Sequence, residues 1–271
     1  MKCDVQGIAV HYEEYGEGKP ILFIHGWGPD SRMMSGCFEP IFKDKHGYRR
    51  IYVDLPSFGQ TPAPAWLTTH DHMVDILCDF VDVVIGDSNF LLAGCSYGGY
   101  LSLGLVHKMG KRINGVFLLV PDVDAHDPNE VFPKRELLWQ SAEMDTIEKC
   151  PAFDYYMSMA VVATPEGFER WLKDIQAGLD LKVGFSGSYE DKFGTQTPSA
   201  IRKLTYSKPA CILVGRQDDG SGFVKQFQLA ERFTRATYAV LDCGGHILQI
   251  DNEPLFQALV KDWIWRVELS N

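Results

Sequence analysis

Short runs of consecutive apolar residues alternate along this chain with longer segments whose apolar positions recur at helical spacing. Runs of the first kind are typical of strands buried on both faces of a parallel sheet. They predict strands at residues 21–24, 50–54, 90–95, 113–120, 209–214 and 237–241. Segments of the second kind predict helices at residues 31–45, 71–85, 97–109, 223–233 and 253–267. The alternation predicts an α/β fold, with a doubly wound, mostly parallel sheet and right-handed crossovers.

Turn and cap signals support the ends of these elements. Val5–Tyr15 predicts a pair of strands with a turn at Gly7, and a turn cluster follows at Gly16–Pro20. Thr69 or Thr68 is expected to cap the helix that follows them. Parallel sheets of this kind bind ligands at the carboxyl ends of their strands, so we look for chemistry there.

The strand rhythm stops between residues 122 and 207. Helical patterns there predict three helices, at residues 130–148, 153–162 and 165–179. The last of them has Thr164 as its N-cap and Pro165 at its first position. We therefore expect a core formed by residues 1–121 and 208–271, with residues 122–207 inserted between two strands as a helical lid.

Candidate chemistry begins at Gly94–Gly98, which links a predicted strand to a predicted helix. The pentapeptide has the pattern G-x-S-x-G, in which the serine lies at the apex of a strained strand-to-helix turn. Such a turn exposes the Ser96 hydroxyl at the end of the sheet and directs the first N–H groups of the helix at the group under attack. Side chains at Gly94 and Gly98 would collide with the neighbouring strand or helix. Ser96 is therefore the candidate nucleophile.

A serine nucleophile needs a base, and the base needs an acid that orients it. His246 is the only histidine after residue 218, and it follows a predicted strand in a glycine-rich loop. Asp218 follows another predicted strand and is the candidate acid, whereas Asp219 is expected to be a solvated turn residue. Asp122, at the end of the preceding core strand, is an alternative acid. We predict that the serine, His246 and Asp218 form a Ser-His-Asp triad.

With these residues in place, the chain resembles the α/β-hydrolase fold superfamily, in its lidded, esterase-like branch. The resemblance rests on the order serine, aspartate, histidine, on the segments His25–Gly28 and Asp54–Gly59, and on the helical insertion. One departure is Ser57, at a turn position where this family commonly has glycine. The motifs are specific for the fold and the triad, and they do not select a substrate.

The resemblance also implies the rest of the site. The backbone N–H groups of Trp27 and Tyr97 would form the oxyanion hole. His25 and Gly26 would support that loop, His25 by tying neighbouring loops together. Epoxide hydrolases and haloalkane dehalogenases of this fold attack with a carboxylate, so a serine at position 96 disfavours those activities.

Composition narrows the classes of function. The net charge of −10 argues against nucleic acid or an anionic membrane as the main partner, because both need clustered Lys and Arg. Since 45% of the 271 residues are hydrophobic, the chain can bury a sizeable core. The N-terminus lacks the apolar segment of a signal peptide, and no run of about 18 apolar residues occurs. We expect a cytoplasmic protein without membrane insertion.

Cysteines and acidic clusters give no sign of a metal. The seven cysteines are odd in number and lack paired C-x-x-C spacing, so reduced thiols are expected, with Cys95 as a small buried hydrophobe. His70–His72 is interpreted as a capping and surface cluster at a helix start. Asp122, Asp124 and Asp127 lack the glycine and final glutamate of a calcium loop. Neither a metal nor a cofactor is expected.

These observations predict a serine hydrolase that cleaves small to medium carboxylic esters through an acyl-enzyme on Ser96. The expected partner is a small-molecule, ester-like substrate. Two alternatives stay open. One is a hydrolase of carbon–carbon bonds in β-diketone-type products, with the same three residues. The other is a ligand-sensing or scaffold protein that retains the fold.

Overall fold

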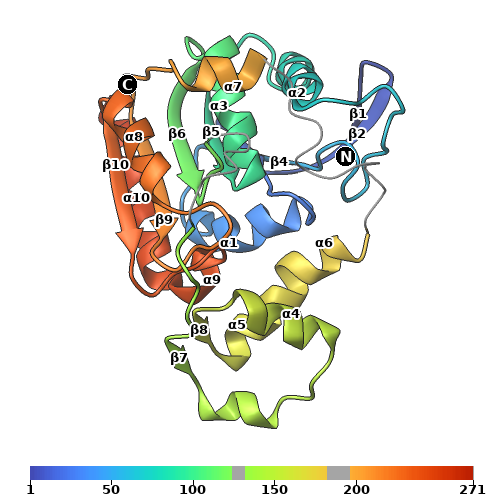
Figure 1. Cartoon of the computed structure of the whole chain (residues 1–271). Coiled ribbons are helices and arrows are strands. Elements are labelled where there is room, and N and C mark those ends of the chain that lie inside the picture. Colours follow the sequence, from blue (N-terminus) through green and yellow to red (C-terminus); the bar gives the residue numbers. More distant parts are fainter. Residues whose placement is uncertain (124–131, 182–195, 271) are drawn as a thin grey trace.

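The computed structural model describes residues 1–123, 132–181 and 196–270. An eight-stranded sheet with the order β1-β2-β4-β3-β5-β6-β9-β10 forms its centre (Figure 1). The strands are β1 (Lys2–Val5), β2 (Ile8–Tyr15), β3 (Lys19–Ile24), β4 (Tyr48–Val53), β5 (Phe90–Cys95), β6 (Ile113–Leu119), β9 (Ala210–Gly215) and β10 (Ala236–Leu241). β2 pairs antiparallel with β1 and β4, and all other neighbours are parallel. The predicted doubly wound, mostly parallel sheet is confirmed.

Helices cover both faces of this sheet. α2 (His70–Val84), α3 (Tyr97–Met109) and α8 (Val224–Arg232) contribute to the core on one face. α1 (Arg32–Phe42) and α10 (Glu253–Glu268) contribute to the core on the other. The sheet is therefore buried on both sides, which explains why its central strands are continuously apolar in sequence.

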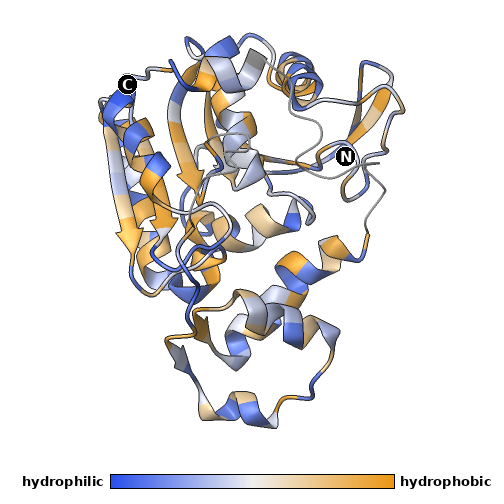
Figure 2. Ribbon diagram, in the orientation of Figure 1, coloured by the Kyte–Doolittle hydropathy of each residue, from blue (hydrophilic) through white to orange (hydrophobic). Residues whose placement is uncertain are grey.

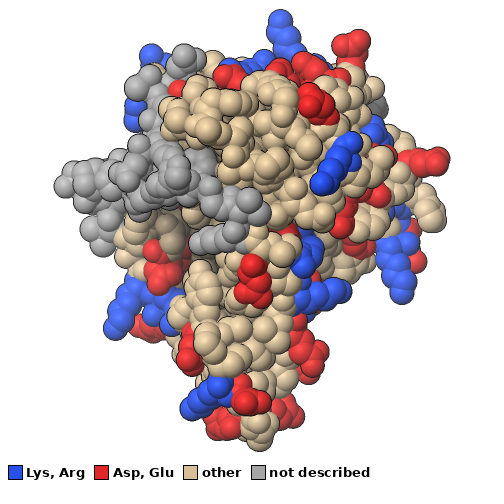
Figure 3. All heavy atoms as spheres, turned by 90° about the vertical axis from the view of Figure 1, so that its right-hand side faces the viewer, with Lys and Arg blue, Asp and Glu red and all other residues tan. Residues whose placement is uncertain are grey.

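Single strands feed both cores. In β3, Leu22 and Ile24 belong to one core, and Ile21 and Phe23 belong to the other. The split follows from the strand period, because successive side chains point to opposite faces. Figure 2 shows the apolar residues concentrated on the central strands. Over the described part of the face in Figure 3, acidic and basic side chains lie next to one another.

The cap and turn signals of the sequence are confirmed. The Thr69 hydroxyl accepts a hydrogen bond from the His72 N–H at 3.3 Å and so caps α2. Gly7 has φ +79°, a value that favours glycine, in the turn between β1 and β2. All seven cysteines are free thiols, and Cys95 is fully buried.

Residues 132–181 lie beyond the carboxyl ends of the central strands, in the lower part of Figure 1. Their elements are β7 (Trp139–Gln140), the 3-10 helix η1 (Ala142–Thr146), α4 (Pro151–Met159), β8 (Val162–Ala163), α5 (Pro165–Trp171), the π-helical turn η2 (Leu172–Gln176) and α6 (Ala177–Leu179). The predicted helix at 153–162 is confirmed as α4. The predicted helix at 165–179 is confirmed as the continuous run from α5 to α6, capped by Thr164, whose hydroxyl accepts from the Gly167 N–H at 2.9 Å.

The predicted helix at residues 130–148 is wrong over its described part. Residues 132–148 contain only β7 and η1, and the remainder of that stretch is irregular. The Leu138 and Trp139 N–H groups donate to the Val161 carbonyl in place of helical bonds. Their side chains are 41% and 53% exposed, so the apolar period in this stretch does not mark a buried helix face.

Two short helices have no counterpart in the sequence prediction. They are α7 (Gln196–Ile201), which packs against α2 and α3, and α9 (Leu248–Asp251), which follows His246. One helical turn is too short to display a hydrophobic period. The division into a core and a lid at residues 122–207 stays a prediction. Within the described residues, none of the helices is both long and apolar enough to cross a membrane.

Candidate active site

Ser96 lies at the junction between β5 and α3, where the chain turns sharply. Its φ of 53° and ψ of −119° fall in a region that a residue with a side chain rarely adopts. The Ser96 N–H donates to the Leu119 carbonyl of β6 at 2.9 Å, which holds the turn against the neighbouring strand. The sheet thus fixes the serine at the carboxyl end of its central strand.

The two motif glycines allow this turn by permitting close backbone contacts. A Cβ added at Gly94 would lie 2.2 Å from the Gly98 carbonyl oxygen. A Cβ added at Gly98 would lie 2.2 Å from the Ile24 carbonyl oxygen of β3. Both distances are far below contact, so the predicted collision with the helix and with the neighbouring strand is confirmed.

Three side chains from distant parts of the chain meet at this turn. His246 Nε2 lies 3.0 Å from Ser96 Oγ, and His246 Nδ1 lies 2.9 Å from Asp218 Oδ1. Asp218 is fully buried, whereas the His246 side chain is 19% exposed. Asp218 Oδ1 also accepts from the Gly220 and Ser221 N–H groups, at 2.9 and 3.0 Å. The carboxylate is therefore fixed in position before it orients the imidazole.

The electrostatics of this arrangement favour the charged imidazole. Burial lowers the pKa of His246, but the charge and the hydrogen bond of Asp218 outweigh it and raise that pKa to about 9. Because Asp218 contacts Nδ1, Nε2 is the nitrogen left to exchange a proton with Ser96. The arrangement can take a proton from the serine hydroxyl and hold the resulting imidazolium.

The other two aspartates of this region have different surroundings. Asp122 Oδ1 accepts from the Ser221 hydroxyl, while His246 Nδ1 contacts Asp218. The structure therefore places Asp218, the candidate acid, against the imidazole, and places Asp122, the alternative acid, against Ser221. Asp219 is exposed, as predicted for a solvated turn residue. Asp124 and Asp127 lie outside the described residues.

The loop after β3 contacts the serine from the other side. A Cβ added at Gly26 would lie 3.4 Å from Ser96 Cβ, so the loop and the serine are in van der Waals contact. The Trp27 ring packs edge-on against the fully buried Tyr97 ring, with centroids 5.2 Å apart. The side chains of the two residues expected to supply the oxyanion hole thus pack against each other. That role stays a prediction.

His25 and His70 are both fully buried behind the site. His25 Nε2 accepts from the Leu55 N–H at 3.0 Å, so its Nδ1 carries the proton and donates to the Gly26 carbonyl at 2.7 Å. Burial lowers the pKa of His25 and keeps the ring neutral. The surface interpretation of His70 is wrong, because its Nδ1 hydrogen-bonds the Tyr97 hydroxyl inside the protein.

A cavity of about 310 Å³ opens above Ser96 and His246. Most of its apolar lining comes from α1, α4 and the run from α5 to α6. Its lining residues are Gly26, Trp27, Pro29, Met33, Ser96, Asp122, Tyr155, Met159, Trp171, Ile175, Leu179, Gly220, Ser221, His246 and Ile247. Sequence reasoning did not find the residues of the apolar wall, because helical periodicity identifies a buried face without saying what that face covers.

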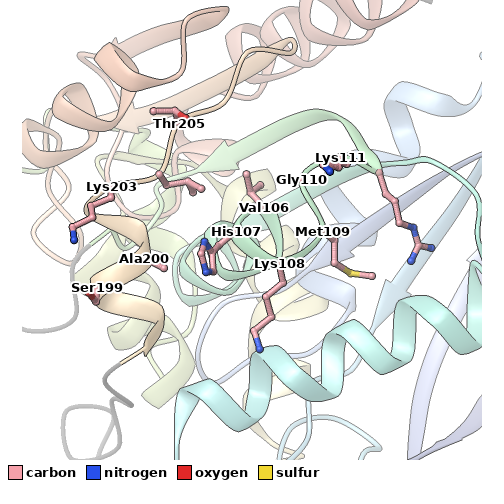
Figure 4. A pocket seen from close by; sticks show the side chains of 12 residues that line it. Val106, His107, Lys108, Met109, Gly110, Lys111, Ser199, Ala200, Lys203 and Thr205 are labelled. Atoms are coloured by element: carbon pink, nitrogen blue, oxygen red, sulfur yellow. The ribbon is translucent and has the colours of Figure 1, made fainter.

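A larger hollow of about 1160 Å³ lies at the opposite end of α3 (Figure 4). The length of α3 separates it from Ser96 by roughly 20 Å. Lys108 and Arg112 in its wall are paired with Asp75 and Asp82. It therefore takes no part in chemistry at the serine.

Comparison with known proteins was made by family and by structure. The model of a family described as the alpha/beta hydrolase family matches residues 21–258. A crystal structure of an alpha/beta superfamily hydrolase from Oenococcus oeni PSU-1 is similar, with a TM-score of 0.86 and 24% identity, over 96% of each chain. At that identity the likeness concerns the fold.

Two curated relatives match shorter stretches. A pimeloyl-acyl-carrier-protein methyl ester esterase of Legionella pneumophila (strain Corby) is 36% identical over 104 residues, which are 38% of each protein. A 2-hydroxy-6-oxo-6-(2'-aminophenyl)hexa-2,4-dienoic acid hydrolase of Metapseudomonas resinovorans is 29% identical over 113 residues, 42% of this chain and 39% of the relative. The matched stretches thus span about two fifths of either relative.

Proposed function

We propose that this chain, which belongs to the alpha/beta hydrolase family, hydrolyses small to medium carboxylic esters through an acyl-enzyme on Ser96. The observation that carries the proposal is the position of His246. Its ring lies 3.0 Å from the Ser96 hydroxyl and 2.9 Å from the Asp218 carboxylate, beneath an apolar cavity. A hydroxyl with a base in reach, and a base with a fixed acid, meet the requirements of nucleophilic catalysis.

In the acylation step, Ser96 Oγ attacks the ester carbonyl carbon while His246 Nε2 takes the hydroxyl proton. Asp218 stabilises the imidazolium through Nδ1–H. The N–H groups of Trp27 and Tyr97 would receive the oxyanion, and a single donor of this kind typically contributes about 3 kcal/mol to the transition state. The tetrahedral intermediate then collapses, the carbon–oxygen bond to the alcohol breaks, and His246 returns the proton to the leaving alcohol.

Deacylation repeats the same steps with water. His246, now neutral, takes a proton from a water molecule that attacks the acyl carbonyl carbon. Collapse of the second intermediate breaks the bond to Ser96 Oγ and returns the proton to it. The products of this step are a carboxylic acid and the free enzyme, and water is the one further reactant that the sequence consumes.

The cavity wall supports an uncharged, apolar substrate. The described lining residues include no Lys or Arg, and they include the acidic side chain of Asp122. A substrate carboxylate buried there would lose its hydration with no Lys or Arg to pair with and with Asp122 beside it, at a cost of several kcal/mol. The wall therefore favours a neutral ester over the dienoic acid that the Metapseudomonas relative hydrolyses.

The experiment is a substrate panel on the purified chain and on Ser96→Ala. We expect turnover of neutral p-nitrophenyl esters that disappears in the variant, and much weaker turnover of a dienoate ring-cleavage product. Preference for the dienoate would favour the carbon–carbon hydrolase. A folded chain that turns over neither, with Ser96 inert to a fluorophosphonate, would favour the ligand-sensing protein.

A further inference from the structure

A buried carboxylate outside the proposed triad links two segments of the active-site region. Asp251 lies in α9, five residues after His246, and is only 8% exposed. Its Oδ2 accepts from the Gly245 N–H at 2.9 Å. Its Oδ1 accepts from the Val161 and Val162 N–H groups, at 2.8 and 3.2 Å. One side chain thus joins segments that are distant in the sequence.

Each of these partners adjoins a part of the candidate site. Gly245 directly precedes His246. Val161 comes two residues after Met159, the last residue of α4, and this helix supplies Tyr155 and Met159 to the cavity wall. The His246 loop therefore reaches the cavity wall through a single carboxylate.

The two segments are also packed tightly against each other. A Cβ added at Gly245 would lie 2.9 Å from Val161 Cγ2 and 3.4 Å from the Met159 carbonyl oxygen. Glycine at position 245 therefore permits this close approach, which a side chain would disturb. The carboxylate holds the two segments together there, because both backbones donate to the same side chain.

Keeping this group ionised is costly for the fold. Burial raises the pKa of Asp251 to about 6, although the hydrogen bonds from Gly245, Val161 and Val162 and the charge of Arg135 lower it. A carboxyl whose pKa lies above its usual value is less stable as a carboxylate in the folded chain than in the unfolded one. Folding therefore favours the neutral form of this carboxyl more than the ionised one.

We propose that Asp251 is a positioning residue for the hydrolytic reaction: through Gly245 it sets the distance of His246 from Ser96, and through Val161 it fixes the cavity wall at the end of α4. The inference rests on the proposed function. Asp251 does not line the cavity, so it acts on the substrate only through these two segments.

The test uses Asp251→Asn in the full-length chain. The amide has the same shape but one acceptor instead of two, so either Gly245 or the Val161 pair faces an NH₂ group. We expect kcat for a short p-nitrophenyl ester to fall about 10- to 100-fold, as for other small misplacements of catalytic groups. The acid limb of kcat/KM should move to lower pH, because a looser contact with Asp218 lowers the pKa of His246.

Asp174→Asn is the matched control. Asp174 is also a buried acid, 5% exposed, and its own ion pair is with Arg170 one helical turn earlier, not with the His246 loop. We expect it to lower the melting temperature without changing kcat or the acid limb. A merely structural role of Asp251 would give that same pattern in Asp251→Asn, and this result would overturn the proposal.

If Asp251→Asn does not fold, Asp251→Glu, which keeps both oxygens but displaces them, should fold and lose kcat.

Amide hydrogen exchange separates this inference from the proposed function. Asp251→Asn should accelerate exchange at Gly245, at Val161 and Val162, or at both places, and this readout needs no catalysis. Unchanged exchange at all three amides would refute the link. Faster exchange in Asp251→Asn, together with a wild-type chain that hydrolyses no ester, would uphold the link and reject the ester hydrolase.

Discussion

At the scale of single residues, two buried serines, Ser96 and Ser57, have positive φ angles. Ser96 has φ 53° between a buried strand and a helix, and its glycine neighbours at fixed offsets are visible in the sequence. Asp218 and His246 were found because each follows a strand at the same sheet edge. Ser57 was visible only as a departure from a family pattern, and its φ of 80° explains why glycine is common there.

The raised pKa of His246 predicts the pH dependence of the reaction. The imidazole accepts the serine proton only when it is neutral, so kcat/KM should rise with pH and level off above about 9. Asp218→Asn removes the charge that raises this pKa, so the remaining activity should have its acid limb at lower pH. The loss of activity should be of order 10⁴-fold. Initial rates between pH 5 and about 10 measure both effects. If the acid limb of kcat/KM stays at the same pH in Asp218→Asn, the assignment of Asp218 as the acid is contradicted.

The same pair should affect stability with a definite sign. Because the folded pKa of His246 lies above its unfolded value, its interaction with Asp218 stabilises the fold fully below the unfolded pKa. The contribution is lost as pH rises through about 9.

Ser57→Gly is expected to stabilise the protein. Ser57 is 1% exposed, has φ 80°, and its hydroxyl has no hydrogen-bond partner among the residues that the structure describes. Glycine removes both the strain and the unpaired polar group, against a smaller entropic cost in the unfolded chain, so the free energy of unfolding should rise by about 1 kcal/mol. Ser102→Gly, within α3, should instead lower it by about 1 kcal/mol. Urea titrations of both variants test the difference in sign.

At the scale of elements, helices with a buried face were predictable. α4 and the run from α5 to α6 contribute side chains to the core, and their apolar period marked them. Residues 132–148 carry apolar side chains that are largely exposed, so the helical spacing of these residues led to the wrong prediction of a helix there. What the buried faces cover could not be predicted, because a helix's orientation over the sheet depends on contacts between elements far apart in sequence.

Leu179 in α6 is expected to limit the length of the substrate. It lines the cavity, and its Cδ2 lies 2.9 Å from where a Cβ on Gly28 would be, so it closes the space beside that loop. Leu179→Ala should shift the preference among p-nitrophenyl esters toward longer acyl chains, at about 0.8 kcal/mol for each methylene accommodated. Leu172→Ala, at a position 38% exposed and outside the lining, should leave the preference unchanged. Parallel shifts in both variants would contradict this assignment.

At the scale of the whole molecule, the segment over the active site and the sheet share one core. Phe153, Phe168 and Trp171 belong to the same cluster as residues of α1 and α10. Gly36 in α1 permits the contact, since a Cβ there would lie 2.2 Å from the Asp174 carboxyl carbon. This segment could be recognised in the sequence as a break in the strand rhythm. How this segment attaches to the rest of the molecule could not be predicted from the sequence, because the attachment depends on single close contacts.

Arg170 is the polar part of that attachment. It contacts Asp174, Glu253 of α10 and the Gln249 carbonyl of α9. Arg170→Met should lower the free energy of unfolding by about 1–2 kcal/mol, because Asp174 stays buried without its cation. Lys173→Met, which replaces an exposed neighbour, should change it by less than about 0.5 kcal/mol. Both variants are measured by thermal and urea unfolding. Equal losses of stability in Arg170→Met and Lys173→Met would show that the Arg170 contacts do not stabilise the fold.

The identity of the nucleophile is tested most directly by the site of covalent labelling. The chain is treated with a fluorophosphonate, digested, and sequenced by tandem mass spectrometry, which separates Ser96 from the nearby Ser102. The account predicts one adduct on Ser96, absent in Ser96→Ala, strongly reduced in His246→Ala and unchanged in Ser102→Ala. An adduct on another residue, or a Ser96 that stays unmodified in the folded wild-type chain, would contradict it.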